Sequence, residues 1–328
     1  MNKISIIGAG AWGTAIANTI ANNLHNVCLL TDKIEVATEI NKKHTNSKYV
    51  NGIINMNITA TNILSNAIQN SNLIFLVLPS NVLSQIIIDI SNLKDISFNK
   101  KFIICTKGID SNTNIFFSEL IKEKFHNNAE IAVLSGPNFA EEVFQKTPTI
   151  TTIATKNYDF YEEIQQVLEC DFFKTEYFDD VMSLQLCGLI KNITAILCGI
   201  AEGLQLGRNT HAAIVVKGTK EIEKLCIACG CNTKVITTSA GVGDLVLTCS
   251  SLKSRNMNFG YLIGQGNNVN AIIQNSNNTI EGLLNAQSLS IIEKQYNVKN
   301  SLSGILLDII KNNYSKNELK NIIINLIK

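Results

Sequence analysis

Short, mainly apolar runs recur through the first 180 residues of the chain, separated by longer stretches of mixed character. The runs lie at residues 3–7, 26–31, 73–78, 101–106 and 131–134. Apolar runs of this length are typical of strands in a parallel sheet, which are buried on both faces. The stretches between them, of which the Ala-rich residues 11–23 are the clearest, predict helices. Alternating strands and helices predict a doubly wound α/β fold with a parallel sheet.

The pattern changes near residue 180, after which the chain has no strong strand run. Residues 183–207 form a long apolar helical pattern, in which Gly188, Ala195 and Gly199 would let another helix approach closely. Helical patterns continue at residues 211–229, 255–265, 269–275, 282–294 and 315–327. We therefore predict a Rossmann-type domain over residues 1–181 and a second, all-helical domain over residues 182–328.

Composition and charge narrow the class of protein. A chain of 328 residues with 45% hydrophobic and 17% charged residues is globular and has the size of about two domains. The formal net charge of +1 favours neither a nucleic-acid nor a membrane-surface partner. No apolar run reaches the ~18–20 residues that a membrane span needs. The N-terminal strand also lacks the length and cleavage site of a signal peptide, so we expect a cytoplasmic protein.

The nine cysteines are scattered through apolar stretches, which fits buried thiols in a reducing compartment better than a disulfide framework. One group, Cys226, Cys229 and Cys231, supplies half of a zinc-site pattern, and none of the four histidines lies at a spacing that completes it. We therefore expect no metal site, and a helix that is capped at Gly230 instead.

The first strand runs directly into Gly8-Ala9-Gly10-Ala11-Trp12-Gly13, a G-x-G-x-x-G motif that opens a helix. Gly8 allows the tight turn, Gly10 lets the backbone approach a pyrophosphate, and Gly13 lets the helix pack closely on the strand. Phosphates then bind to N–H groups at the helix start. The motif and its position between strand and helix predict a dinucleotide site.

Asp32 follows the second predicted strand, where an acidic residue hydrogen-bonds the ribose 2′-hydroxyl of NAD and repels the 2′-phosphate of NADP. A preference for NAD follows, although the neighbouring Lys33 could turn toward a 2′-phosphate. The simpler alternative is that Asp32 only caps the next helix.

Further segments are polar or glycine-rich at positions where the packing of the fold alone does not require such residues. They are residues 105–108, 135–140, 188–192, 240–245, 254–256 and 280–282. Lys107 and Ser135-Gly136-Pro137 each follow a predicted strand, and ligands of open α/β sheets bind at the carboxyl ends of strands. Lys191 stands in the middle of an apolar helix, where a lysine destabilises the fold unless it has a partner.

Each of these residues also has a simpler interpretation. Lys107 and Arg255 could be ordinary surface residues, Lys191 could extend to solvent along its helix, and Asp244 could be a helix N-cap. The alternatives weaken when the segments are taken together, because together they resemble the bacterial-type NAD(P)-dependent glycerol-3-phosphate dehydrogenase family. The resemblance covers the chain from Gly8 to Glu281, in the family's order and spacing.

The resemblance implies hydride transfer between NAD or NADP and a small phosphorylated three-carbon substrate. The reaction interconverts sn-glycerol 3-phosphate and dihydroxyacetone phosphate, and the product serves phospholipid synthesis. A homodimer is implied as well. The family's general acid/base falls on Lys191, and Asp244 and Lys107 complete the predicted catalytic residues.

The resemblance also implies the remaining contacts. Those to substrate fall on Lys107, Gly136, Asn138, Lys191, Asp244, Ser254, Arg255 and Asn256. Those to the cofactor fall on Ala11, Trp12, Lys107, Ala140, Arg255, Ile280 and Glu281, beside Gly8, Gly10, Gly13 and Asp32. Asn138 stands where family members usually have Ser or Thr, and Asp32 where many have Arg or His.

The residue types suit this chemistry. A lysine ammonium can protonate the alkoxide that develops when a ketone is reduced, and burial or nearby cations should lower its pKa from the free value of about 10.4. The guanidinium of Arg255 can bind phosphate oxygens in a bidentate manner. Two other functions stay open: a related hydroxy-acid dehydrogenase with a catalytic lysine, and a non-catalytic dinucleotide sensor.

Overall fold

The computed structural model describes residues 3–69, 71–93, 100–110, 112–275, 280–299 and 301–328. The chain divides into two compact units. The first comprises Met1–Thr106 and Ile115–Val181, and the second comprises Lys107–Asn114 and Met182–Lys328. The short segment Lys107–Asn114 thus groups with the second unit, although the chain returns to the first unit after it and leaves that unit only at Val181. The domain limits 1–181 and 182–328 remain predictions.

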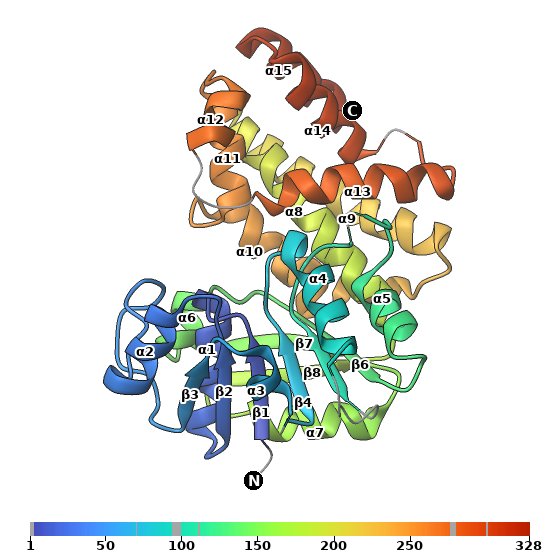
Figure 1. The fold of residues 1–328 in the computed structure, drawn as a ribbon. Helices are drawn as coiled ribbons and strands as arrows, with labels where there is room; N and C mark the ends of the chain where they lie inside the picture. The colour runs from blue at the N-terminus through green and yellow to red at the C-terminus, as the bar shows by residue number, and fades with distance from the viewer. Residues whose placement is uncertain (1–2, 70, 94–99, 111, 276–279, 300) are drawn as a thin grey trace. The chain divides into compact units, whose positions relative to one another are not determined.

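Within the described residues, the first unit is built on an eight-stranded sheet with the order β3-β2-β1-β4-β5-β6-β7-β8 (Figure 1). The strands are β1 (Lys3–Ile7), β2 (Asn26–Leu30), β3 (Ile58–Thr61), β4 (Leu73–Leu76), β5 (Lys101–Ile104), β6 (Glu130–Ser135), β7 (Thr149–Ala154) and β8 (Phe173–Phe178). The order reverses between β1 and β4, as in Rossmann folds. The predicted doubly wound α/β class is therefore confirmed.

Two features of the sheet differ from the predicted one. The five apolar runs of the sequence become β1, β2, β4, β5 and β6, but β3, β7 and β8 were not predicted. The sheet is also not wholly parallel, because β6 and β7 run antiparallel, with Leu134 opposite Ile153. A short helix and a loop between these two strands are enough to reverse the chain, whereas a parallel connection needs a longer crossover.

Helices cover both faces of the sheet. They are α1 (Ala11–Asn22), α2 (Ile34–Lys43), α3 (Leu64–Ile68), α4 (Ser80–Ser91), α5 (Phe117–Lys124), α6 (Ala140–Phe144) and α7 (Tyr158–Leu168). α1 packs against α6 and α7, while α3, α4 and α5 pack on one another in sequence. The core between α1 and the sheet is apolar and includes the completely buried Ile6, Ile16 and Phe75.

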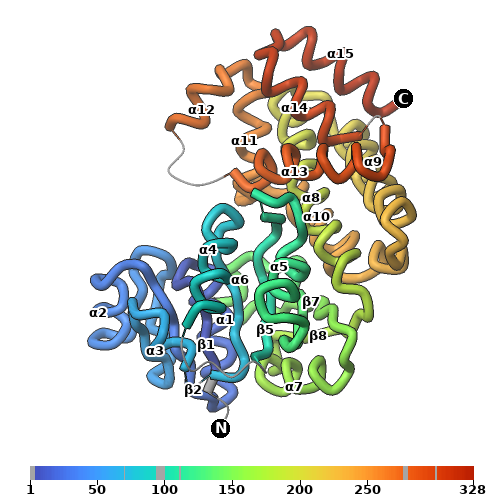
Figure 2. Tube along the Cα trace, turned by 45° about the vertical axis from the view of Figure 1, so that its right-hand side comes forward, coloured from blue at the N-terminus to red at the C-terminus, as the bar shows by residue number. Residues whose placement is uncertain are grey.

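The named secondary-structure elements of the second unit are all helices over its described residues (Figure 2). Its helices are α8 (Val181–Gly203), α9 (Gly207–Ala228), α10 (Asp244–Ser250), α11 (Arg255–Gly264), α12 (Val269–Asn275), α13 (Glu281–Gln295), α14 (Leu302–Asn312) and α15 (Lys316–Ile327). A 3-10 turn (Thr233–Thr237) and a π-helical turn (Ser239–Gly243) precede α10. All the predicted helical patterns of this half are confirmed, while α10 and α14 are additional.

The sequence analysis, which found no apolar run as long as a membrane span, did not anticipate α8, which is long and apolar enough by length and composition. α8 has 23 residues with a mean hydropathy of 1.6 over its most apolar window. That window is 100% buried inside the protein, as in the core helix of a soluble protein. The apolar character of α8 therefore reflects packing against the other helices of its unit.

Glycines let α8 and α11 approach at backbone distance, as the small residues of the sequence predicted. A Cβ on Gly199 of α8 would lie 2.0 Å from the carbonyl oxygen of Met257, and a Cβ on Gly260 of α11 would lie 1.9 Å from that of Ile196. Real Cβ atoms do not approach so closely, so both positions need glycine in this packing. The position of α11 is thereby fixed against α8.

The end of α9 confirms the predicted glycine cap. Gly230 has a φ of +69°, which is the left-handed conformation that glycine adopts most easily. Its N–H donates to the carbonyl of Ile227, and the N–H of Cys231 donates to that of Cys226 at 2.7 Å, which is the Schellman arrangement. Over the described part of the chain, no group of three or more His, Cys, Asp or Glu could hold a metal.

Candidate active site

The glycine motif forms a tight turn between β1 and α1, at the point where the strand order reverses. Gly8 has a φ of +117°, and a Cβ there would lie 2.2 Å from the carbonyl oxygen of Val77 on the neighbouring strand's continuation. A Cβ on Gly13 would lie 1.9 Å from the carbonyl oxygen of Gly8, so helix and turn pack without side chains between them. Gly10 differs, because a Cβ on it would have nothing within 4 Å.

These three environments fit a dinucleotide. Open space beside Gly10 leaves its backbone accessible, and the positive end of the α1 dipole lies at this turn. Trp12 and Ala140, at the starts of α1 and α6, both pack partly buried against the core of the first unit. The turn is thus shaped as the sequence predicted for a pyrophosphate.

Asp32 lies on the surface directly after β2. The N-cap of α2 is Lys33, and this N-cap makes no side-chain capping bond. The alternative that Asp32 only caps this helix is therefore wrong. Asp32 remains available for a ribose hydroxyl, and its role there stays a prediction.

Gly136 and Asn138 follow β6, in the loop before α6. A Cβ on Gly136 would lie 2.9 Å from Cα of Thr151, so the loop packs on β7. The amide of Asn138 donates to Oγ1 of Thr149 at 2.7 Å and to the carbonyl of Ile150 at 3.1 Å. Both amide hydrogens are thus used within the first unit, which gives Asn138 a role in holding the loop. Its predicted contact with substrate stays untested.

The second unit brings the three predicted catalytic residues together. Asp244 accepts a hydrogen bond on Oδ2 from Nζ of Lys107 at 2.6 Å and on Oδ1 from Nζ of Lys191 at 2.5 Å. The side chain of Asp244 is 2% exposed and that of Lys191 is 7% exposed, whereas that of Lys107 is 26% exposed. Asn285 of α13 also donates to the carbonyl oxygen of Lys107. One buried carboxylate therefore joins a buried lysine to a partly exposed one.

The simpler interpretations of Lys191 and Asp244 do not hold. Lys191 is buried in the middle of α8, so its ammonium does not reach solvent along the helix. Asp244 has helical backbone angles as the first residue of α10, and the N-cap position is Gly243. The side chain of Asp244 is directed to the lysines.

The electrostatics of this cluster suit proton transfer. The pKa of Lys191 is lowered to about 7, mainly by burial and with a contribution from Lys107, against the opposing charge and hydrogen bond of Asp244. Burial raises the pKa of Asp244, but the two lysines outweigh it and hold the pKa below its ordinary value. Asp244 is thus ionised when Lys191 changes its protonation state, and the predicted lowering of the lysine pKa is confirmed in direction.

Thr248 is a member of this cluster that the sequence did not reveal. Its Oγ1 lies 3.2 Å from Nζ of Lys191 and 3.1 Å from Oδ1 of Asp244. The only signal in the sequence is its position four residues after Asp244, which places both side chains on one face of α10. Thr248 holds the contact between the lysine and the carboxylate from the side.

A second cluster of amides lies in the same unit. Nδ2 of Asn256 donates to Oδ1 of Asn192 at 2.9 Å, and Oδ1 of Asn256 accepts from the N–H of Gly282 at 3.0 Å. Asn192 directly follows Lys191 on α8, while Gly282 is the second residue of α13. Asn256 therefore links α8 to α13, the helix that begins with the predicted cofactor residue Glu281. Ile280, the other predicted contact there, is the N-cap of α13.

Arg255 and Ser254 form the start of α11. Oγ of Ser254 accepts from the N–H of Met257 at 3.3 Å and caps the helix. Arg255 is exposed at the first helical position, beside the buried Asn256. A guanidinium at a helix N-terminus adds its charge to that of the helix dipole, and both attract an anion.

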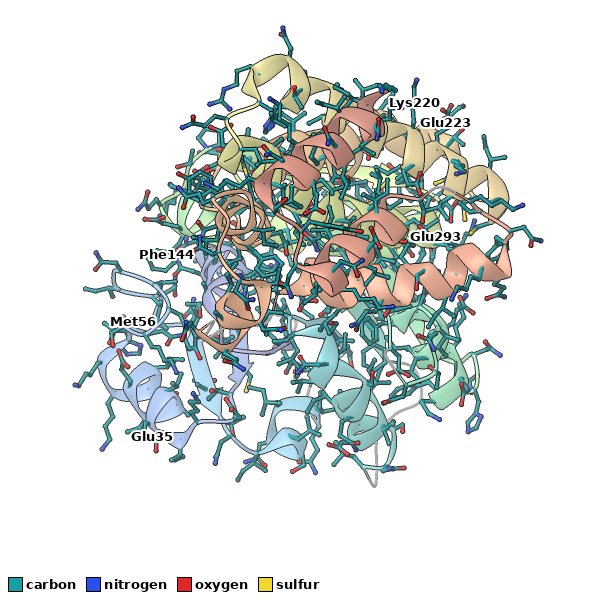
Figure 3. All side chains as sticks on the ribbon, turned by 90° about the horizontal axis from the view of Figure 1, so that it is seen from above. Glu35, Met56, Phe144, Lys220, Glu223 and Glu293 are labelled. Atoms are coloured by element: carbon teal, nitrogen blue, oxygen red, sulfur yellow. The ribbon has the colours of Figure 1, made fainter. Side chains whose placement is uncertain are left out.

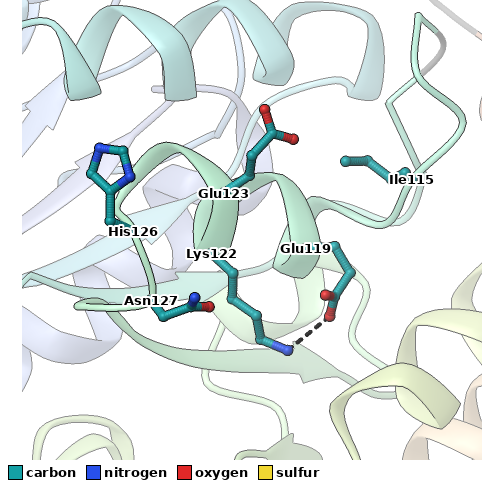
Figure 4. A pocket seen from close by; sticks show the side chains of 6 residues that line it. All are labelled: Ile115, Glu119, Lys122, Glu123, His126 and Asn127. Carbon is teal, nitrogen blue, oxygen red and sulfur yellow. Dashed lines mark hydrogen bonds and ion pairs between the residues drawn. The ribbon is translucent and has the colours of Figure 1, made fainter.

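A separate surface hollow lies along α5 in the first unit (Figure 4). Its lining includes the exposed ion pair between Lys122 and Glu119, together with His126 and Asn127. No predicted site residue is among those that line it. An exposed ion pair of this kind contributes little to stability. Because the hollow contains none of the predicted site residues either, we assign it no function.

A lysine whose pKa lies near 7 can give a proton to an alkoxide and take one from an alcohol, while the glycine turn suits a dinucleotide. On a Rossmann fold, these features define a dinucleotide-dependent dehydrogenase. The chain belongs to the NAD-dependent glycerol-3-phosphate dehydrogenase family, because the model of its N-terminal part matches residues 3–161 and that of its C-terminal part matches residues 180–321.

Individual relatives agree with this assignment. The chain is 33% identical over 315 residues to a glycerol-3-phosphate dehydrogenase [NAD(P)+] of Bacillus cereus, which covers 95% of the chain and 92% of the relative. A crystal structure of glycerol-3-phosphate dehydrogenase from Coxiella burnetii matches 100% of the chain and 99% of its own, with a TM-score of 0.92 and 29% identity. A structure of glycerol-3-phosphate dehydrogenase from Plasmodium falciparum covers 98% of this chain and 94% of its own, with a TM-score of 0.87 and 25% identity.

Proposed function

We propose that the chain catalyses the interconversion of dihydroxyacetone phosphate and sn-glycerol 3-phosphate with NAD(H) or NADP(H). The observation that carries this proposal is the buried Lys107–Asp244–Lys191 network in a chain of this family. Both family models match, one on each half of the chain, which favours this reaction over that of a related hydroxy-acid dehydrogenase. A non-catalytic dinucleotide sensor would have no use for a buried lysine with a pKa near 7.

The cofactor, when bound, supplies or accepts the hydride, and the chain has to manage the proton. During ketone reduction, Lys191 in its ammonium form donates a proton to the oxygen that becomes the alcohol. During oxidation the neutral amine of Lys191 accepts that proton. Since its pKa is about 7, both forms are populated near neutral pH.

Asp244 keeps Nζ of Lys191 in a fixed position and balances its positive charge. It also holds Nζ of Lys107, whose charge favours negative charge that develops on a nearby oxygen. Because Asp244 is buried and bonded to both lysines, their geometry is set before any ligand binds. Such preorganisation avoids a reorganisation cost during the reaction.

Arg255 and Ser254 are the proposed ligands of the substrate phosphate. The phosphate lies away from the reacting carbon, so its binding free energy can be used to orient the ketone. Asn256 is held by Asn192 and Gly282, which leaves one of its amide hydrogens for a ligand. For the cofactor, the N–H groups of the turn between β1 and α1 are the proposed ligands of the pyrophosphate.

Three further points complete the proposal. Glycerol 3-phosphate is the backbone from which phospholipids are built, so we assign the enzyme to their synthesis. Nine free cysteines fit the reducing cytoplasm. The family resemblance supports a homodimer, which size-exclusion chromatography with light scattering would test.

A spectrophotometric assay with dihydroxyacetone phosphate and either NADH or NADPH tests the function directly. We expect turnover of dihydroxyacetone phosphate and none of a panel of 2- and 3-keto acids. Preferential turnover of a keto acid would show the hydroxy-acid function instead. Binding of cofactor without turnover of any substrate would favour the sensor.

A further inference from the structure

A single asparagine, Asn46, connects the loop after α2 to the glycine turn. Its side chain is completely buried in the first unit. Nδ2 of Asn46 donates to the carbonyl oxygen of Ala9 at 2.9 Å and to Oγ1 of Thr14 at 2.8 Å. These bonds join residues that are 37 and 32 positions apart in the sequence. The loop therefore supports the turn from inside the protein.

The partners fix the direction of each hydrogen bond. The carbonyl of Ala9 can only accept, so it must face the NH₂ group of Asn46 and not its oxygen. The hydroxyl of Thr14 donates to the carbonyl of Gly10 at 2.8 Å, so its oxygen is left to accept from Asn46. Asn46 thus holds the carbonyl of Ala9 directly and that of Gly10 through Thr14.

The position of these two carbonyls determines where the next two N–H groups point. In a trans peptide the C=O and the following N–H point in opposite directions, and no described peptide bond is cis. The N–H groups of Gly10 and Ala11 are therefore directed away from Asn46. Among the described residues neither is paired with a protein acceptor, and the space beside Gly10 is open.

We propose that Asn46 is a positioning residue for the dinucleotide pyrophosphate, acting through Ala9 and Thr14 to aim the N–H groups of Gly10 and Ala11 at the phosphates. The inference rests on the proposed function and deepens it. Asn46 itself does not contact the cofactor, because it lies behind the turn and is fully buried. Its Oδ1 has no hydrogen-bond partner among the described atoms, although an unpaired buried acceptor destabilises a fold. Retaining a buried amide at this cost is expected where function and not stability sets the residue.

The experiment compares cofactor binding with catalysis in Asn46→Ala. Loss of the two bonds frees the peptide between Ala9 and Gly10 and loosens the hydroxyl of Thr14, while the carbonyl of Gly10 keeps its bond from the N–H of Thr14. We therefore expect the KM for NADH to rise about tenfold, an effect of the size expected for one or two hydrogen bonds. The inhibition constant of ADP-ribose, which carries the pyrophosphate but no nicotinamide, should rise by the same factor. The kcat and the KM for dihydroxyacetone phosphate should stay within about threefold, because no hydrogen bond of Asn46 reaches the lysine cluster.

Asn41→Ala is the matched control. Asn41 of α2 also makes two hydrogen bonds, donating to the carbonyl of Ala60 and accepting from its N–H, both at 2.8 Å. Its loss should lower the Tm without changing the KM for NADH. An equal rise in that KM for both variants would show general loosening of the unit and overturn the proposal, as would an unchanged KM in folded Asn46→Ala.

Thr14→Val provides a second route if Asn46→Ala does not fold. It keeps the branched shape and removes only the hydroxyl that links Asn46 to Gly10. We expect the KM for NADH to rise about threefold, in keeping with the loss of a single hydrogen bond. An unchanged KM in this variant would overturn the proposal. Failure of the unmodified enzyme to bind NADH would contradict the proposed function instead.

Discussion

Nζ of Lys191 on α8 lies 2.5 Å from Oδ1 of Asp244 at the start of α10, and both side chains are almost fully buried. A lysine in this position would lose its charge to desolvation if the carboxylate were absent. The carboxylate moderates that effect and leaves the pKa near 7. The pair therefore sets the acidity of Lys191 as well as its position.

Lys191→Ala should abolish turnover while leaving the affinity for NADH nearly intact. Loss of a positioned acid/base group lowers a rate by about 10²–10⁴. The proposed ligands of the pyrophosphate lie in the turn between β1 and α1, and Lys191 is not among the predicted cofactor contacts. Steady-state rates and fluorescence titration with NADH would measure the two effects. A kcat within a few-fold of that of the unmodified enzyme would rule out this role.

The pH dependence of the two directions should be opposite. Reduction needs the ammonium of Lys191, so its kcat/KM should fall as pH rises through about 7, whereas that of oxidation should rise over the same range. Lys107→Met removes a neighbouring positive charge, which raises the pKa of Lys191 and should move both midpoints to higher pH. Midpoints that stay fixed in Lys107→Met would show that another group titrates.

Arg255→Lys should weaken substrate binding although the charge is kept. A guanidinium binds two phosphate oxygens at once, and an ammonium does not reproduce that geometry. We expect the KM for dihydroxyacetone phosphate to rise about tenfold with a smaller change in kcat. Lys253→Arg, at an exposed position in the preceding turn, serves as the control. An unchanged KM in Arg255→Lys would remove Arg255 from the phosphate ligands.

The enzyme should prefer NADH to NADPH, and Asp32→Arg should narrow or reverse that preference. An acidic side chain repels the 2′-phosphate of NADP, while a guanidinium attracts it. Lys33→Met tests the neighbouring charge separately and should lower kcat/KM for NADPH alone. Values of kcat/KM with each cofactor are the measurement. If the unmodified enzyme already prefers NADPH, then Asp32 does not select the cofactor.

Glu221→Gln should stabilise the protein at alkaline pH. Glu221 on α9 and Glu293 on α13 are 6% and 3% exposed, and each has an Oε1 without a hydrogen-bond partner among the described atoms. The pKa of Glu221 is raised to about 7, mainly by burial and with a contribution from the charge of Glu293, while the charge of Lys224 opposes the shift. The folded protein therefore binds more protons than the unfolded chain between about pH 4.5 and 7, and its stability falls as pH rises through that window.

Glutamine keeps the shape of the protonated acid and removes the charge. The free energy of unfolding at pH 8 should increase by on the order of 2–3 kcal/mol, with little change at pH 5. Urea denaturation at both values would measure this. Glu223→Gln is the control, because Glu223 lies exposed on the same helix, α9. Glu293, whose charge acts on Glu221, is buried among the side chains of the helical unit (Figure 3). Equal gains at pH 5 and pH 8 would contradict the explanation.

The central strands could be predicted from the sequence because their burial on both faces makes them apolar throughout. Leu73–Leu76, for example, is buried at every position. The edge strands lack that signal. In β8, Phe173 and Phe178 are buried but the residues between them are not, and in β3, at the opposite edge, buried and less buried residues alternate. Sequence patterns of this kind do not distinguish an edge strand from a loop.

The candidate site could be predicted where a residue type was out of place in its surroundings. Lys191 in an apolar helix is such a case, and its partner Asp244 came from a glycine-rich segment. Thr248 and Asn46 gave no such signal, because threonine and asparagine are ordinary residues of helices and loops. Their roles depend on contacts between distant segments, which only the folded chain provides.

The glycines between α8 and α11 have a consequence for the substrates that the enzyme can accept. α8 carries the proposed acid/base Lys191 and α11 begins with the proposed phosphate ligand Arg255, and the contacts at Gly199 and Gly260 leave no room for a methyl group between the helices. The spacing of these two helices is therefore fixed, and with it the separation of the backbone segments that carry Lys191 and Arg255. Under the roles that we propose for Lys191 and Arg255, we expect a substrate with a longer separation between carbonyl and phosphate to need a different spacing of α8 and α11.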